Sequence, residues 1–237
     1  MPWTKWKSDI NQAITSVCIQ IIKEPLIYFS EADIQQLLVE ELRKINSISK
    51  PYLTSVHKGK NSKGKYKTSL IHREYGGGNR TRIDIVIFDP SDVQKINNVN
   101  LTIKKQYLKL AYAFELGTEK TSDTYTHLKN DLKKLIKRIK SGGTGYLIYF
   151  YKDTTQSGTG TISRVNTEEK IERMFKKVIL QNPPTNKNIK ILAILMRTYR
   201  HQKRMRGKCE IFNGQEWIKT NVGSYNKLQK AIINQLR

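Results

Sequence analysis

Three carboxylic acids stand at positions where the surrounding residues predict burial. Asp84 interrupts the apolar segment 83–88, and Glu115 interrupts the apolar segment 110–116. Glu31 is in phase with the apolar face of a predicted helix at 3.6 residues per turn. A buried carboxylate is costly unless it is protonated, ion-paired or bound to a cation. Carboxylates that converge from two strands and a helix supply the oxygen ligands that Mg²⁺ prefers. The sequence therefore predicts a divalent-metal site, at which Mn²⁺ could replace Mg²⁺.

Each of these acids also has a simpler explanation. A carboxylate at the end of a strand often pairs with a nearby arginine, and Arg80 and Arg82 precede Asp84. For one acid taken alone, the ion pair is the better interpretation. Three such acids in a strongly basic chain favour the metal site.

Two further pairs of polar residues have spacings that would let them contact a substrate or a ligand together. His72 and Glu74 alternate along a predicted strand and could contact a substrate, and His127 and Asp131 stand four apart on a predicted helix. Local pairing on the strand face or on the helix surface explains both pairs equally well or better.

Apolar periodicity predicts the elements that must position these residues. Residues 46–67 are rich in Lys, Ser, Gly and Asn and predict a basic loop, and 91–108 form an insertion of uncertain structure. Turns are predicted at 76–79, at 142–145 and around 213–214. Helices are predicted at about 3–22, 30–45, 122–140, 168–180 and 225–236, and strands at about 68–75, 80–89, 110–116, 146–151 and 189–199.

The order of these elements predicts an α/β fold with a mixed central β-sheet flanked by helices. Four of the strands are almost continuously apolar, as strands buried on both faces are. A chain of 237 residues favours one domain. We expect a core at about 25–200, followed by a basic C-terminal extension at about 200–237.

The net charge predicts a polyanionic partner. Lys and Arg number 43 and Asp and Glu 20, which gives a formal net charge of +23. Nucleic acid is the leading candidate, because phosphate contacts release counterions. A membrane surface would call for one basic amphipathic helix, whereas these charges are spread along the chain. The basic residues that we expect to contact DNA are Lys58, Lys60, Lys63, Lys65, Arg80, Arg82, Arg200, Lys203, Arg204 and Arg206.

Several classes of protein are excluded or disfavoured. Two cysteines, Cys18 and Cys209, cannot form a disulfide scaffold, and their surroundings lack the spacing of a zinc site. No apolar stretch approaches the ~20 residues that span a bilayer, and the first residues lack the apolar segment of an export signal. We therefore expect a cytoplasmic protein.

Together these motifs resemble the PD-(D/E)XK nuclease superfamily, whose fold many restriction endonucleases share. The resemblance covers about residues 25–155 and rests on an acidic first helix, on the strand Arg82-Ile83-Asp84-Ile85-Val86-Ile87 and on Ala113-Phe114-Glu115-Leu116-Gly117 followed by a helix. It implies that Glu31 matches the acid of the first core helix. Asp84 then matches the motif aspartate, and Glu115 the acid of the (D/E)XK pair.

The resemblance also implies a mechanism of phosphodiester hydrolysis. Asp84, Glu115 and the Leu116 carbonyl would hold Mg²⁺, and Glu31 would complete the site. The motif lysine, however, should stand at position 117, which is glycine. In the superfamily this lysine is known to migrate, and Lys120 is the candidate that we select, with Lys129 as a second.

The predicted function is therefore Mg²⁺-dependent cleavage of double-stranded DNA, in restriction or another anti-phage or mobile-element role, by a chain that could act as a homodimer. Two alternatives stay open. The missing lysine at Gly117 favours a degenerate nuclease-fold module that binds DNA or RNA without cutting it. A basic RNA- or ribosome-associated protein is the third hypothesis.

Overall fold

The computed structural model of the chain describes residues 5–24, 27–28, 30–58, 62–76, 82–94, 108, 110–118, 124–152, 161–201, 204–212 and 217–220. The described strands form a mixed seven-stranded sheet in the order β3-β4-β5-β6-β7-β8-β9 and a separate hairpin, β1-β2. The predicted α/β class with a mixed sheet is thus confirmed. The predicted helix at 225–236 lies outside the described residues.

The central strands β5, β6 and β7 are parallel, and antiparallel strands extend the sheet on both sides. Apolar runs explain the middle of the sheet, since β4 and β5 are buried along almost their whole length. The strands are β3 (Ile71–Tyr75), β4 (Ile83–Phe88), β5 (Leu110–Thr118), β6 (Ile139–Lys152), β7 (Lys190–His201), β8 (Arg204–Phe212) and β9 (Trp217–Thr220).

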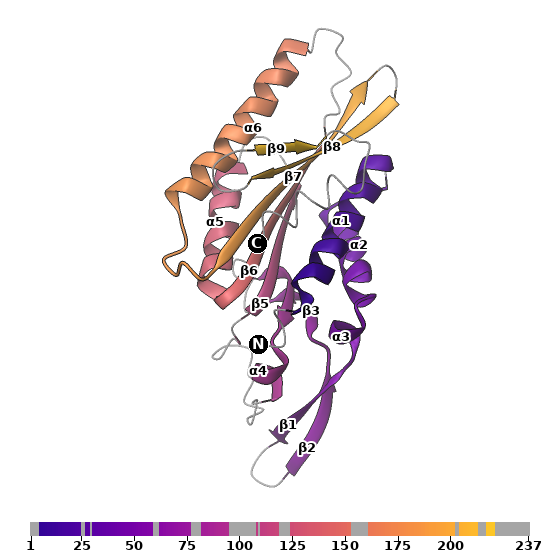
Figure 1. Cartoon of the computed structure of the whole chain (residues 1–237), viewed down its shortest axis with the longest axis vertical. Coiled ribbons are helices and arrows are strands. Elements are labelled where there is room, and N and C mark those ends of the chain that lie inside the picture. Colours follow the sequence, from indigo (N-terminus) through magenta and orange to yellow (C-terminus); the bar gives the residue numbers. More distant parts are fainter. Residues whose placement is uncertain are drawn as a thin grey trace.

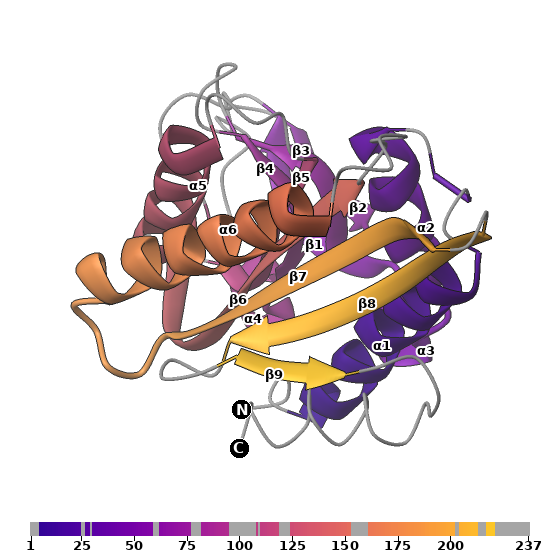
Figure 2. The same ribbon diagram turned by 90° about the horizontal axis from the view of Figure 1, so that it is seen from above.

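Helices cover both faces of the sheet (Figures 1 and 2). One face carries α1 (Lys7–Lys23) and α2 (Glu31–Arg43), which pack on each other and on β8, β5 and β4. The other face carries α5 (Thr124–Arg138) and α6 (Thr161–Gln181), the crossover helices between the parallel strands. Two short helices, α3 (Asn46–Ser49) and α4 (Pro90–Gln94), complete the described elements.

The start of α2 is fixed by a capping box. The Ser30 hydroxyl accepts from the Asp33 backbone N–H at 3.3 Å, and the Asp33 carboxylate accepts from the Ser30 N–H at 2.8 Å. Both bonds satisfy N–H groups that the first turn of a helix leaves open. This cap sets Glu31 as the first residue of the helix.

The prediction of a loop at 46–67 was wrong. Residues Tyr52–Lys58 (β1) and Ser62–Thr68 (β2) pair antiparallel as a hairpin that projects from the lower end of the molecule in Figure 1. Its sequence lacks the alternation of apolar and polar residues from which a strand is predicted.

The glycines at 142–145 do not end a helix before a strand, as predicted, but lie inside β6. A Cβ at Gly143 would lie 2.7 Å from the Ala111 carbonyl oxygen, and one at Gly145 would lie 2.6 Å from Ile139 Cδ1. Small residues are therefore required here for close packing rather than for a turn.

Two other boundaries differ from the prediction. Helix α6 begins at Thr161 rather than near 168. Strands β8 and β9 join the central sheet, although residues beyond about 200 were predicted to form an extension outside the core. Among the described helices, none combines the length and apolarity needed to cross a membrane.

Candidate active site

Asp84 and Glu115 lie side by side on neighbouring strands. Strands β4 and β5 pair antiparallel with Ile85 opposite Phe114, and the same register places Asp84 opposite Glu115. Side chains of directly opposed residues share a face of the sheet, with Cβ atoms about 5 Å apart. The two acids predicted from separate strands are therefore brought together.

The Asp84 carboxylate is tied to the backbone of the neighbouring strand. Its Oδ2 accepts a hydrogen bond from the Leu116 N–H at 2.6 Å. Burial raises the pKa of Asp84 to about 7, the Leu116 bond opposes this rise, and the nearby Glu31 carboxylate adds to it. The group is thus poised to lose its proton near neutral pH.

Glu115 is almost fully buried, with a side chain that is 2% exposed. Its Oε2 lies 2.8 Å from the Lys134 ammonium, whereas its Oε1 has no hydrogen-bond partner within the part of the chain that the structure describes. Burial raises the pKa of Glu115 well above its usual value, and repulsion from Asp84 and Asp131 adds to the rise. A buried carboxylate oxygen without a donor is a free ligand position.

The lysine that reaches Glu115 comes from helix α5. Lys134 Nζ donates to Glu115 Oε2 and lies 2.8 Å from Asp131 Oδ1, and it donates to the Arg82 carbonyl at 3.0 Å. Burial alone would lower the pKa of this ammonium, but the charges of Glu115 and Asp131 hold the pKa above its usual value. Lys134 therefore stays protonated.

Position 117 has no room for a side chain. It pairs with Tyr149 on β6, and a Cβ at Gly117 would lie 2.5 Å from the Tyr149 ring. The ring occupies the space on the Glu115 face that a side chain at 117 would need. The Tyr149 hydroxyl donates to Asp131 Oδ2 at 2.6 Å, so this ring also anchors the acid that holds Lys134.

Glu31 approaches the same cluster from the start of α2. Its carboxylate accepts a hydrogen bond from the backbone of Thr118, at the end of β5. Burial raises the pKa of Glu31, and the Asp131 and Glu74 carboxylates contribute to the rise. The helix acid, the two strand acids and Asp131 thus influence one another electrostatically. We call Glu31, Asp84, Glu115 and Asp131 the acidic cluster.

A polar chain links the acidic cluster to the edge strand β3. Gln35 donates to the Asp84 carbonyl at 2.9 Å and to Glu74 Oε1 at 3.1 Å, and it accepts from Arg73 Nε at 2.9 Å. Glu74 has a φ of 51°, which is an unusual backbone conformation for a residue with a side chain. Arg82 lies 3.8 Å from Glu74, so the predicted arginine pairs there rather than with Asp84.

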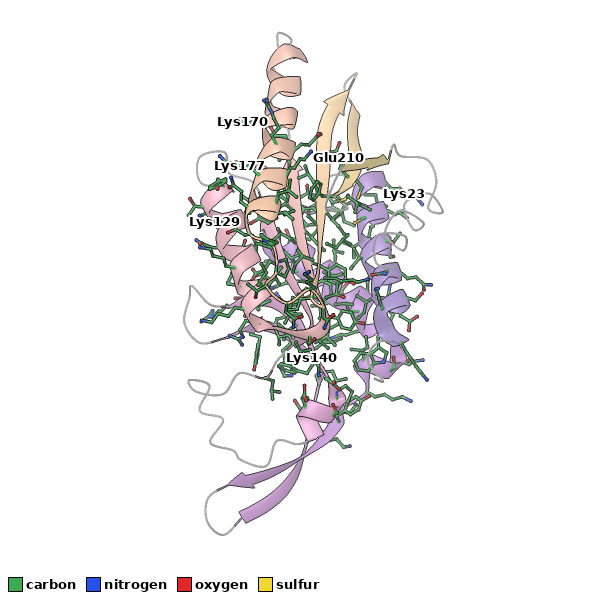
Figure 3. All side chains as sticks on the ribbon, turned by 60° about the vertical axis from the view of Figure 1, so that its left-hand side comes forward. Lys23, Lys129, Lys140, Lys170, Lys177 and Glu210 are labelled. Carbon is green, nitrogen blue, oxygen red and sulfur yellow. The ribbon has the colours of Figure 1, made fainter. Side chains whose placement is uncertain are left out.

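Lys140 is a second partly buried lysine that contacts two carboxylates. Lys140, labelled in Figure 3, donates to Asp89 at 2.6 Å and to Asp92 at 2.9 Å. Burial alone would raise the pKa of Asp89, but bonds from Lys140 and Ser91 keep it below its usual value. The pKa shift of Asp84 and Glu115 has the opposite sign. Burial is the main cause of the raised pKa of Asp84 and Glu115, and the charge of Lys134, which is shared with Asp131, does not offset it.

The other predicted residues lie at several places. His72 Nε2 donates to the Ser69 carbonyl oxygen at 2.8 Å, and His127 is exposed on α5. Lys129 points to the outer side of α5 (Figure 3). Lys120, Lys60, Arg80 and Lys203 lie outside the described residues; Lys58 ends β1, Lys63 and Lys65 lie in β2, Arg200 lies in β7, and Arg204 and Arg206 lie in β8.

The acidic cluster fits a divalent cation in its chemistry. Within the described residues, no three His, Cys, Asp or Glu side chains already stand around one point at metal-binding distance. Mg²⁺, however, is commonly held by one or two carboxylates, with water and substrate phosphates completing its shell. Asp84 and Glu115 meet that requirement, and the free Glu115 Oε1 is an available ligand atom.

Comparison of the chain with models of known protein families, with curated proteins and with solved structures gives no match. The chemistry of the acidic cluster is therefore inferred from its own geometry. Three features of the cluster indicate this chemistry: the opposed acids, the single ammonium and the free carboxylate oxygen.

Replacing Asp84 with asparagine is expected to stabilise the metal-free protein at high pH. The raised pKa means that the folded state binds this proton more tightly than the unfolded state, so ionisation costs stability as the pH rises from about 4 to 7. In EDTA at pH 8, Asp84→Asn should raise the free energy of unfolding by about 2–4 kcal/mol, and the difference should vanish near pH 4. Urea denaturation at several pH values measures this, with Asp9→Asn, an exposed acid, as control. A difference in the free energy of unfolding that does not change with pH would contradict the raised pKa of Asp84.

A methyl group at position 117 should disturb the packing around Tyr149. Because the ring lies where the Cβ would stand, Gly117→Ala should lower the free energy of unfolding by about 1–3 kcal/mol. Combining it with Tyr149→Leu should recover part of that loss, since the smaller side chain frees the space. Thermal denaturation of the two single variants and the double variant measures the coupling, and additive effects would show that the two positions do not compete.

Proposed function

We propose that this chain is a metal-dependent endonuclease that hydrolyses phosphodiester bonds of DNA, built on a restriction-endonuclease-like core. The observation that carries the proposal is the pair of opposed acids, Asp84 and Glu115, with the Lys134 ammonium bound to one of them. Two strand carboxylates and a lysine are the residues that the resembled superfamily uses for this reaction.

The side chains would divide the work as follows. Asp84, Glu115 and the Leu116 carbonyl would hold Mg²⁺, and Glu31 would complete the site. When bound, the ion would neutralise phosphate charge and lower the pKa of a water molecule. Lys134 would place a fixed positive charge beside the phosphate, where negative charge develops during hydrolysis. Asp131 and Tyr149 would keep Lys134 in position through their hydrogen bonds.

The order of the elements supports the same proposal. An acidic helix, α2, precedes the antiparallel strands β3, β4 and β5, and the crossover helix α5 then leads to the parallel strand β6. Glu31, Asp84 and Glu115 lie on the first helix and on the second and third strands of this series. These are the elements on which the resemblance expects them.

DNA is the substrate that the charge favours. Strand β7 runs parallel to β5, so its carboxyl end lies at the same edge of the sheet as Glu115 and Thr118. Beyond that edge, β7 and β8 continue as a pair in which Arg197 stands opposite Lys208 and His201 stands opposite Arg204. Basic positions on both strands of a ribbon beside the acids suit contact with phosphates.

A binding module without nuclease activity is the second candidate. It is favoured by the glycine at the motif position 117 and by the lack, within the described residues, of a preassembled group of three metal-ligating side chains. Binding of DNA without cleavage in Mg²⁺ and in Mn²⁺ would support it.

Cleavage of supercoiled plasmid tests the proposal. The chain should nick or linearise the plasmid in Mg²⁺ and not in EDTA, and Glu115→Gln should abolish the activity. Lys134→Gln should lower the rate by about 10²–10³, because a charge that stabilises the transition state is lost. Lys137→Gln removes an equal charge from an exposed position on the same helix and should retain most of the activity. Equal activity in the Lys134 and Lys137 variants would remove Lys134 from the mechanism.

A further inference from the structure

Lysines that do not reach the acidic cluster gather along the boundary between α5 and α6. Lys129 and Lys133 stand four residues apart on α5, and Lys170 and Lys177 stand seven apart on α6, spacings that keep each pair on one side of its helix. Figure 3 labels three of them on the side of the sheet that α5 and α6 cover, with Lys23 of α1 on the other side. We call Lys129, Lys133, Lys170 and Lys177 the lysine seam.

The ring of Tyr125 lies close to two lysines of the seam, one from each helix. The ring centroid is 6.0 Å from Lys129 Nζ and 5.8 Å from Lys177 Nζ. The Tyr125 hydroxyl also lies 3.4 Å from Gln181 Oε1, which joins α5 to α6. Each ammonium is attracted by the ring face, but the two ammonium groups repel each other. An anion between or beside them would remove that repulsion.

Among the described residues, the lysine seam has no acidic partner. Within the described residues, none of its four lysines forms an ion pair, whereas Lys134 on the opposite flank of α5 contacts two carboxylates. Helix α5 therefore has two differently charged sides. One side supplies an ammonium to the acidic cluster, and the other presents positive charge to solvent. Unpaired charge of one sign is a binding surface for the opposite sign.

We propose that the lysine seam binds the phosphate backbone of the DNA on which the acidic cluster acts. This inference rests on the proposed function. An extended polyanion fits better than a small anion, because the lysines follow each helix for about 6 Å on α5 and about 10 Å on α6. Helix α5, about 10 Å across, separates the seam from Lys134. That separation is well under one turn of duplex, about 34 Å, so one duplex can reach both.

The experiment measures DNA binding without cleavage. The parent is the Glu115→Gln chain in EDTA, and its affinity for a fluorescent duplex is measured over a range of salt concentrations. The seam variant adds Lys129→Gln and Lys177→Gln, and the matched control adds Lys23→Gln and Lys50→Gln, which remove two exposed charges from the other side. A third chain carries Lys129→Arg and Lys177→Arg. Thermal melting of each chain reports whether it is folded.

The seam variant should bind DNA about tenfold or more weakly than the parent at about 0.1 M salt. The slope of log K against log salt should fall by about 1.8, because each lost phosphate contact contributes about 0.9. The control should change little, and the arginine chain should bind like the parent. Equal losses of DNA affinity in the seam variant and the control would overturn the role of the lysine seam in DNA binding and leave the proposed function intact. A parent that does not bind DNA at all would overturn both.

Discussion

Two carboxylates stand opposite each other on neighbouring strands, with one ammonium in contact, and the structure around them is arranged to keep them there. Strand pairing fixes Asp84 against Glu115, and burial removes the water that would separate their charges. Lys134 neutralises part of this charge, since it meets both Glu115 and Asp131. Burial raises the pKa values of Asp84 and Glu115, neighbouring acids add to the rise, and the cluster favours a further positive charge. A divalent ion is the simplest species that supplies it.

The fold could be predicted where burial leaves a pattern in the sequence. The apolar runs of β4 and β5 and the stripe of α5 identify a mixed sheet with helices on its faces. Prediction failed for β1 and β2, which pair as a hairpin although their sequences lack apolar alternation. It also failed at Gly143 and Gly145, where glycine serves close packing inside β6 rather than a turn. Composition does not distinguish these two uses of glycine.

The acids Glu31, Asp84 and Glu115 were predicted from the sequence, but Lys134 was not. Acids inside apolar strands are conspicuous, whereas Lys134 is one of several lysines on an amphipathic helix. A weak signal exists, because Asp131 and Lys134 stand three apart on the flank of the apolar stripe rather than on its outer face. The position of the lysine depends on how the strands pack. Tyr149, 32 residues beyond Gly117, fills the space that a side chain at 117 would need, and the ammonium that contacts Glu115 comes from α5.

Titration of the metal-free protein with Mn²⁺ at pH 6, monitored by calorimetry in two buffers that differ in ionisation enthalpy, tests the central claim most directly. We predict saturable binding with release of protons, because Asp84 and Glu115 hold protons more tightly than ordinary carboxyl groups and must lose them to the metal. Binding should be lost in the Asp84→Asn and Glu115→Gln variants and retained in Asp9→Asn. The same binding in wild type and in the double variant Asp84→Asn/Glu115→Gln, or no binding in wild type, would contradict the assignment of the acidic cluster as a cation site.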